Sequence, residues 1–130
     1  MIRIPRSIVE KIAEQARQEA PNEACGYLCG VDHEVRQRFP LTNMDRSPEH
    51  FTLDPREQFA TVKEARRLGL RPVAVYHSHP STPARLSRED IRLANDPATV
   101  YVIYSLSQGN LRAFCVGADK SVTDIPVEIT

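Results

Sequence analysis

The chain has 130 residues, 41% of them hydrophobic, which is enough for one domain with a buried core. Its 17 basic and 17 acidic residues give a net charge of zero, which argues against nucleic acid or an anionic membrane as the main partner. No stretch is long and apolar enough for a signal peptide or a membrane span, and three cysteines do not suggest a disulfide framework. A single-domain cytoplasmic protein spanning residues 1–130 is the expectation.

Hydrophobic periodicity and turn residues predict a mixture of helices and strands. The expected helices cover residues 5–19, 54–68 and 87–95. The expected strands cover residues 23–30, 34–39, 72–76, 99–106, 111–116 and 122–129. The order α-β-β-α-β-α-β-β-β predicts a mixed α/β fold, with a sheet flanked by helices, and not the repeating βαβ unit of a doubly wound fold.

Local motifs mark where the first two helices begin. Ser7 and Glu10 have the spacing of a capping box. Asp54 followed by Pro55 is a strong helix start, and Glu57 is expected to reach back to the cap. The apolar residues of these helices recur at helical spacing and are expected to face the core: Ile8, Ile12 and Ala16 in the first helix, and Phe59, Val62, Ala65 and Leu68 in the second.

Two of the cysteines, Cys25 and Cys29, fall on the first expected strand and could form a second metal site with His33. Four residues of strand separate the two thiols by about 13 Å. That distance is too long for a disulfide or a shared zinc ion, so buried free thiols are the expectation.

The most informative segment is His77-Ser78-His79-Pro80, which follows the strand at 72–76. Side chains alternate along a strand, so His77 and His79 point the same way. Seven residues, 80–86, separate His79 from Ser87. Asp90 lies in the first turn of the next helix and is a candidate third ligand. Two imidazoles and a carboxylate suit zinc and leave a fourth position open for water, as in a catalytic site.

Each part of this pattern also has a plainer interpretation. A His-x-His pair is often exposed to solvent, and Ser87 to Asp90 fits an ordinary capping box in which Asp90 accepts backbone amides. Taken together, the spacing favours a metal site. A general base is less certain from the residues alone, because Glu23 stands at the start of a strand, where an acid is usually solvated.

Three parts of the sequence form one pattern: Glu23, His77-Ser78-His79-Pro80 and Ser87-x-x-Asp90. This pattern resembles the complete signature of the JAMM metalloproteases, the catalytically active members of the MPN domain family. That signature is a Glu, a distant His-Ser/Thr-His, seven residues, and Ser-x-x-Asp. The resemblance spans the chain and is closest to the small, single-domain prokaryotic members. It rests also on the helix before Glu23, the Pro-Asn-Glu-Ala-Cys-Gly run, and the segment around Asn43, Ser47, Pro48 and Phe51.

The resemblance implies the MPN fold and zinc-dependent amide hydrolysis. One Zn²⁺ ion with a bound water would be held by His77, His79 and Asp90, and the pKa of such a water falls from 15.7 to roughly 7. Glu23 would take its proton and pass it to the leaving amine. Ser87 would donate to the developing oxyanion, and such a donor is typically worth ~3–4 kcal/mol.

The resemblance also implies a protein partner. The small prokaryotic relatives act on the C-terminal Gly-Gly tail of ubiquitin-like sulfur-carrier proteins, and release of cysteine from a carrier–cysteine adduct is the favoured reaction. A flexible Gly-Gly tail suits a narrow cleft, which the loops at 42–50 and 81–86 are expected to flank. The insertions by which eukaryotic relatives hold ubiquitin are absent, which argues against ubiquitin as the substrate.

Three alternatives remain open at this point: an isopeptidase that removes ubiquitin-like modifiers from conjugates, a small-molecule amidase, and a zinc-binding scaffold without activity. A nucleoside deaminase is excluded, because the sequence has neither His-x-Glu nor Pro-Cys-x-x-Cys. Tyr76 and Arg85 are candidates for substrate contact because they lie close to the histidines in sequence. His33 and His50 are assigned no role, and the sequence does not indicate an oligomeric state.

Overall fold

A computed structural model describes residues 1–130 as helices packed on one eight-stranded sheet. The helices are α1 (Arg6–Glu19), α2 (Pro55–Arg67) and α3 (Arg88–Leu93). The strands are β1 (Ile2–Ile4), β2 (Cys25–Val31), β3 (Glu34–Leu41), β4 (Arg71–His79), β5 (Val100–Ser105), β6 (Asn110–Val116), β7 (Val122–Ile125) and β8 (Val127–Ile129). The expected mixed α/β class is confirmed. The structure adds strand β1, which is too short to show periodicity in the sequence. It also divides the expected strand at 122–129 into β7 and β8 at Pro126.

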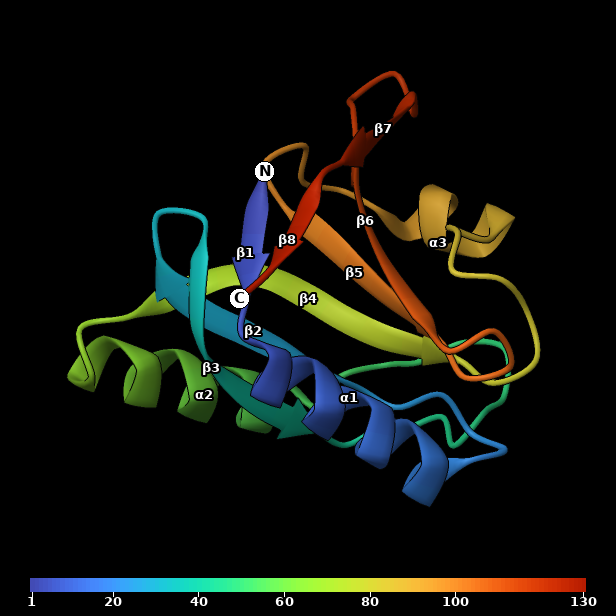
Figure 1. Ribbon diagram of the computed structural model, residues 1–130, viewed down its shortest axis with the longest axis horizontal. Helices are drawn as coiled ribbons and strands as arrows, with labels where there is room; N and C mark the ends of the chain where they lie inside the picture. The colour runs from blue at the N-terminus through green and yellow to red at the C-terminus, as the bar shows by residue number, and fades with distance from the viewer.

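The strand order in the sheet is β7-β6-β5-β4-β2-β3-β1-β8. β4 pairs with β5 in parallel, as β1 does with β3 and β8, and the other neighbouring strands are antiparallel. Only Pro126 separates β7 from β8 in the chain, yet these strands form the two ends of the order. The sheet must therefore curl until its edges approach, and in Figure 1 the red ribbon of β8 crosses in front of β5.

The main core lies between α1 and one face of the curled sheet. The predicted α1 residues are buried there with alternate residues of β4 and β5: Ile8, Ile12, Ala16, Ala74, Tyr76, Val100, Val102 and Tyr104. The intervening residues Val75, His77 and Tyr101 line a cleft on the other face, together with residues of α2 and α3. Alternation with a period of two thus separates the core from the histidine face.

Two predictions about the helices are wrong. α1 follows Pro5 without any side-chain cap, because Ser7 already lies inside the helix. On α2, Phe59 and Leu68 are 68% and 40% exposed, whereas Ala65 is fully buried. The helix packs on the sheet through a narrow strip that includes Ala65 and Thr61, so Val62 is only half-buried and Phe59 remains in solvent.

The start of α2 uses only half of the expected capping motif. Asp54 accepts a hydrogen bond from the Arg56 amide at 2.9 Å, as predicted. Glu57 does not reach back to the cap. Its carboxylate instead accepts two hydrogen bonds of 2.8 Å from the amide and hydroxyl of Thr42, which tie α2 to the segment after β3.

The buried cysteines are free thiols, as expected, and Cys115 is also unpaired. Burial raises the pKa of Cys25 to about 12 and that of Cys29 to about 11. Both thiols therefore stay protonated at neutral pH, which is the unreactive form.

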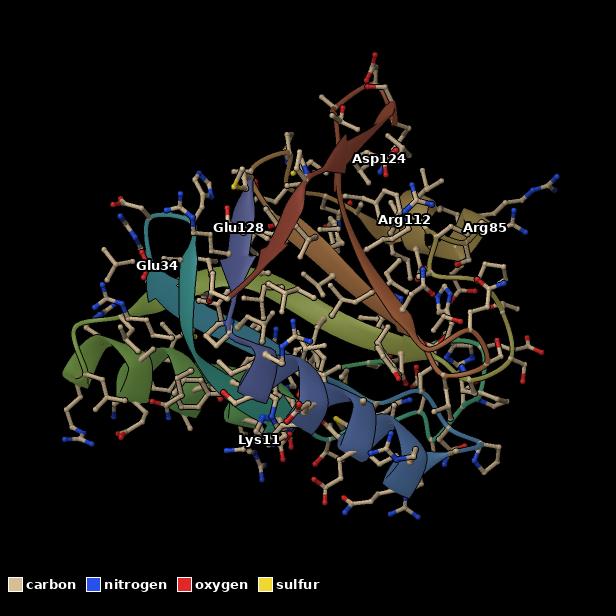
Figure 2. The ribbon with its side chains drawn as sticks, in the orientation of Figure 1. Lys11, Glu34, Arg85, Arg112, Asp124 and Glu128 are labelled. Atoms are coloured by element: carbon tan, nitrogen blue, oxygen red, sulfur yellow. The ribbon has the colours of Figure 1, made fainter.

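A charged pair lies on the two strands at one end of the sheet order, β7 and β6. Figure 2 shows Arg112 on β6 and Asp124 on β7, which are joined by a hydrogen bond of 2.6 Å. Charges on an edge strand discourage pairing with another chain. No helix of the structure combines the length and the apolar character needed to cross a bilayer.

Candidate metal centre

The two histidines of the motif lie at the end of β4, which continues as far as His79. On one side His77 pairs with Cys25 of β2, and on the other side it pairs with Ile103 of β5. The two histidine residues are 1% and 5% exposed. Their Nε2 atoms lie 3.2 Å apart, so the strand brings both imidazoles to one point.

Asp90 reaches the same point from α3. The Ser87 hydroxyl accepts a hydrogen bond from the Asp90 amide at 3.0 Å, and the Ser87 amide donates to Asp90 Oδ2 at 2.9 Å, which together form a capping box. The same Oδ2 atom lies 3.3 Å from Nε2 of both His77 and His79. The capping box therefore orients the Asp90 carboxylate toward the two imidazoles, so the same carboxylate serves the cap and faces the histidines.

The spacing of these three donor atoms fits a zinc ion. Tetrahedral ligands with bonds of about 2.0–2.1 Å lie about 3.3–3.4 Å from one another. The observed separations are 3.2 Å between the imidazoles and 3.3 Å from each imidazole to the carboxylate. The donor set therefore suits an ion with three protein ligands and an open fourth position.

Surrounding groups fix the two imidazoles in different ways. His79 Nδ1 lies 3.0 Å from the Pro83 carbonyl, which only accepts, so Nδ1 carries a hydrogen and Nε2 is the ring nitrogen that faces the other donor atoms. His77 Nδ1 is buried without a partner. Its ring instead packs against Phe51, with ring centroids 4.8 Å apart.

Ionisation in this cluster follows from burial and mutual contact. Burial opposes charge on His79, but hydrogen bonds to Asp90 and to the Pro83 carbonyl outweigh it and raise the pKa of His79. Burial likewise opposes charge on Asp90, yet the hydrogen bonds from His77 and His79 hold the pKa of Asp90 well below its usual range. Asp90 is thus ionised and ready to act as a ligand at neutral pH.

Glu23 lies just before β2, and the antiparallel register of β2 and β4 places it across from His79. Ser78 fixes this junction: its amide donates to the Ala24 carbonyl at 2.9 Å, and its hydroxyl accepts from the Ala24 amide at 2.8 Å. Glu23 is 2% exposed, and its Oε1 atom is buried without a partner. Burial raises the pKa of Glu23 to about 8. It is therefore not the solvated acid of the plainer interpretation.

Residues 5–116 match the family model for prokaryotic homologs of the JAB domain. The chain belongs to this family. The "CysO-cysteine peptidase" of Mycobacterium tuberculosis is 35% identical over 131 residues, which span 97% of this chain and 89% of that protein. The "probable TtuB-protein conjugate cleaving protease" of Thermus thermophilus is 34% identical over 92% of this chain and 78% of its own length.

Solved structures share the fold of this chain. A protein of Desulfitobacterium hafniense superposes with a TM-score of 0.91 at 42% identity, covering 100% of this chain and 93% of that one. A JAB1/MPN domain protein from Archaeoglobus fulgidus has a TM-score of 0.68 at 19% identity, over 99% and 97% of the two chains, which shows the fold alone. The expected MPN fold is confirmed, and the chain is a hydrolase of the JAMM metalloprotease type.

A cleft of about 340 Å³ opens beside the candidate metal centre of this JAB-family chain. It runs from His77 and Asp90 along β4 and β5, and α2 and α3 form its sides. Its lining is largely aromatic and aliphatic, and includes Tyr27, Phe51, Leu53, Val75, Leu93 and Tyr101. His50, to which the sequence assigned no role, also lines it, so the loop at 42–50 flanks the cleft as expected.

Other expectations for the surroundings of the centre do not hold. Tyr76 is fully buried on the opposite face of β4, where its hydroxyl donates to Gln15, so its proposed substrate contact is wrong. Arg85 is exposed, lies beside α3 in Figure 2 and does not line the cleft. The loop at 81–86 does not line it either, but it supplies the Pro83 carbonyl that holds His79. No sequence pattern signals a backbone carbonyl of this kind.

The raised pKa of Glu23 predicts a specific pH dependence of stability in the zinc-free protein. Between its ordinary pKa of 4.5 and about 8, the folded protein keeps a proton that the unfolded chain has lost. As the pH rises through this window, the free energy of unfolding should therefore fall by up to about 1.4 kcal/mol per pH unit because of Glu23. Glu23→Gln should remove that slope. Urea unfolding at several pH values measures it, and parallel curves for the two proteins would contradict the assignment.

Proposed function

We propose that this chain is a zinc metallopeptidase that cleaves an amide bond at the C-terminal tail of a ubiquitin-like sulfur-carrier protein, releasing cysteine from a carrier–cysteine adduct. The observation that carries the proposal is the set of three donor atoms at tetrahedral spacing, with the buried carboxyl of Glu23 across from them. Residues 1–130 would form a single catalytic domain in the cytoplasm. The mycobacterial relative, whose name describes cleavage of a CysO–cysteine bond, supports this choice of substrate.

His77, His79 and Asp90 are the proposed zinc ligands. A bound zinc ion supplies Lewis acidity, which makes water more acidic and polarises an amide carbonyl. Glu23 takes the proton of the attacking water on its carboxylate and returns it to the nitrogen of the leaving amine. With a pKa of about 8 before metal binds, the Glu23 carboxylate is a stronger base than an ordinary glutamate, and a pKa near neutrality suits a group that first accepts a proton and then returns it.

Ser87 is the proposed donor to the substrate carbonyl oxygen. Its hydroxyl oxygen accepts from the Asp90 amide, so the hydroxyl hydrogen is not used by the capping box. A preorganised donor of this kind stabilises the developing oxyanion by ~3–4 kcal/mol.

The cleft supports an extended tail as substrate. It is bounded by α2, α3 and the segment that carries Phe51, and it meets the metal centre at His77 and Asp90. Only residues without side chains pass close to such a buried centre, which suits a Gly-Gly terminus. The apolar walls would contact the residues that precede it.

A second candidate is an isopeptidase that removes a ubiquitin-like modifier from a protein conjugate. The Thermus relative favours it, because its name describes cleavage of a protein conjugate. The two candidates share the scissile-bond chemistry and differ in the amine that is joined to the Gly-Gly terminus: a single cysteine in one, a lysine side chain in the other.

Mass spectrometry can distinguish these substrates. The zinc-loaded protein is incubated with a sulfur-carrier protein that carries a C-terminal cysteine adduct, and in parallel with a carrier–lysine conjugate and a small acyl-amide. We expect the adduct to lose the mass of one cysteine residue. Cleavage of the conjugate alone would establish the isopeptidase, and cleavage of only the small amide would replace both proposals with an amidase.

A further inference from the structure

Asn43 is a buried polar residue outside the JAMM signature. It lies between β3 and α2 and is 4% exposed. Its side-chain amide donates to the carbonyls of Glu23 and His50, each at 3.1 Å. Its side-chain oxygen accepts from the amides of Asp45 at 3.0 Å and Thr52 at 3.3 Å. The side chain thus fastens the loop at 43–52 onto itself and onto Glu23.

This connection matters because β4 bonds the next residue, Ala24, but leaves the backbone polar groups of Glu23 itself without a strand partner. The paired residues of β2 begin at Cys25, two positions later. The loop takes the place of a neighbouring strand: the Glu23 amide donates to the Ser47 carbonyl at 2.8 Å, and the Glu23 carbonyl accepts from Asn43. Both backbone polar groups of Glu23 therefore depend on one loop, which Asn43 organises.

The same loop touches the metal centre at a second point. Phe51 follows His50, whose carbonyl is held by Asn43, and its ring packs on His77 at 4.8 Å between centroids. Asn43 is thus hydrogen-bonded to the backbone of Glu23. It is also hydrogen-bonded to the segment that carries Phe51, and the Phe51 ring supports His77, the proposed ligand whose Nδ1 has no hydrogen-bond partner.

We propose that Asn43 is a positioning residue for hydrolysis, which holds the Glu23 backbone so that the carboxyl stays across from His79. The inference rests on the proposed function, in which Glu23 carries the proton. A displacement of about 1 Å at a reacting group can lower the rate by about 100-fold. A residue that only stabilised the loop would change the fraction of folded protein and not the rate per folded, zinc-loaded molecule.

Asn43→Asp is the main test, because it replaces the donor NH₂ group of the side-chain amide and keeps the acceptor oxygen. The carboxylate still accepts from Asp45 and Thr52 but presents an oxygen, instead of a donor, to the Glu23 carbonyl. We expect zinc to remain bound at one ion per chain and kcat on the carrier–cysteine adduct to fall by about 10–100-fold, with KM changed by less than about 3-fold. Asn43→Ser, which is small and uncharged, is the second variant should the carboxylate prevent folding.

Thr52→Val is the matched control in the same loop. It removes the hydroxyl that donates to Asp45 at 2.6 Å but leaves the Thr52 amide bonded to Asn43. Its kcat should stay within about 2-fold of wild type, since it leaves the Asn43–Glu23 bond in place. An equal loss of kcat in Thr52→Val and Asn43→Asp would show a general effect of loop disorder and overturn the proposal.

A double-variant cycle shows whether Asn43 acts through Glu23. With Glu23→Gln as background, Asn43→Asp should reduce the residual rate by less than about 3-fold, because the group that it positions is already missing. The same 10–100-fold loss in both backgrounds would overturn the proposal.

Hydrogen exchange separates this proposal from the proposed function. The Glu23 amide should exchange at least about 10-fold faster in Asn43→Asp, with the amides of Leu28 and Cys29 unchanged. Unchanged exchange at Glu23 overturns the positioning role whatever the substrate. Faster exchange in a protein that cleaves none of the tested substrates would support the contact and would locate the failure in the proposed function.

Discussion

Asp90→Ala is expected to abolish stoichiometric zinc binding and, with it, peptidase activity. Asp90 supplies the only carboxylate among the three donor atoms, and its Oδ2 lies 3.3 Å from both imidazole nitrogens. Loss of an outer partner of a ligand already weakens metal binding by about 10–100-fold, so loss of a ligand should weaken it by at least about 100-fold. Metal analysis after dialysis, and competition with a chromogenic chelator, measure the change.

Two further variants separate the charge from the cap. Glu89→Ala removes the neighbouring acid in the first turn of α3 and should keep one zinc ion per chain. Asp90→Asn keeps an oxygen that can accept from the Ser87 amide, so the capping box survives while the negative charge is lost. Zinc affinity should be intermediate in this variant. Full zinc occupancy in Asp90→Ala would remove Asp90 from the ligand set.

Glu23→Gln is expected to give the opposite pattern, with zinc retained and activity lost. Glutamine has the size of glutamate but cannot take a proton from water, and a positioned acid–base group typically contributes about 10²–10⁴-fold to the rate. The buried Oε1 atom of Glu23 has no protein partner, so the substitution breaks no hydrogen bond made by that atom. The measurement is kcat on the carrier–cysteine adduct, paired with zinc content and thermal unfolding of the same sample.

Glu49→Gln is the control for this experiment, because Glu49 is an exposed acid in the loop next to Glu23 and is not needed by the mechanism. Its activity should match that of wild type. Wild-type turnover by Glu23→Gln would exclude Glu23 as the proton carrier, whereas loss of zinc from that variant would point instead to a ligand role.

The sequence predicts the meeting of the three donor residues well because their geometry comes from short-range rules. Alternation along a strand places His77 and His79 on one face, and a capping box fixes the direction of Asp90 relative to its own helix. The sequence presented cap and ligand as alternatives, since each uses the same carboxylate. Only the three-dimensional arrangement shows that Oδ2 serves the cap while facing the imidazoles.

Features that depend on contacts between distant segments were not predictable. The sequence places Asn43 in the family resemblance but gives it no role, because its bond to Glu23 spans 20 positions. Gly26 reads as part of a strand, yet a Cβ there would lie 2.5 Å from the Tyr76 ring on the core face. Phe59 fits the helical period of α2 but stays exposed, because periodicity marks a helix face and not the width of its contact.

The pairing of β1 with β8 has a consequence for how the protein is made. Ile2 and Ile4 are fully buried, and their partners in β8 are Val127 and Ile129. A ribosome adds about 5–20 residues per second, so Ile2 and Ile4 wait roughly 6–25 s for the strand that pairs with them. During that interval these two apolar side chains are available to chaperones, and the β1–β8 edge of the sheet forms only after β8 has been synthesised.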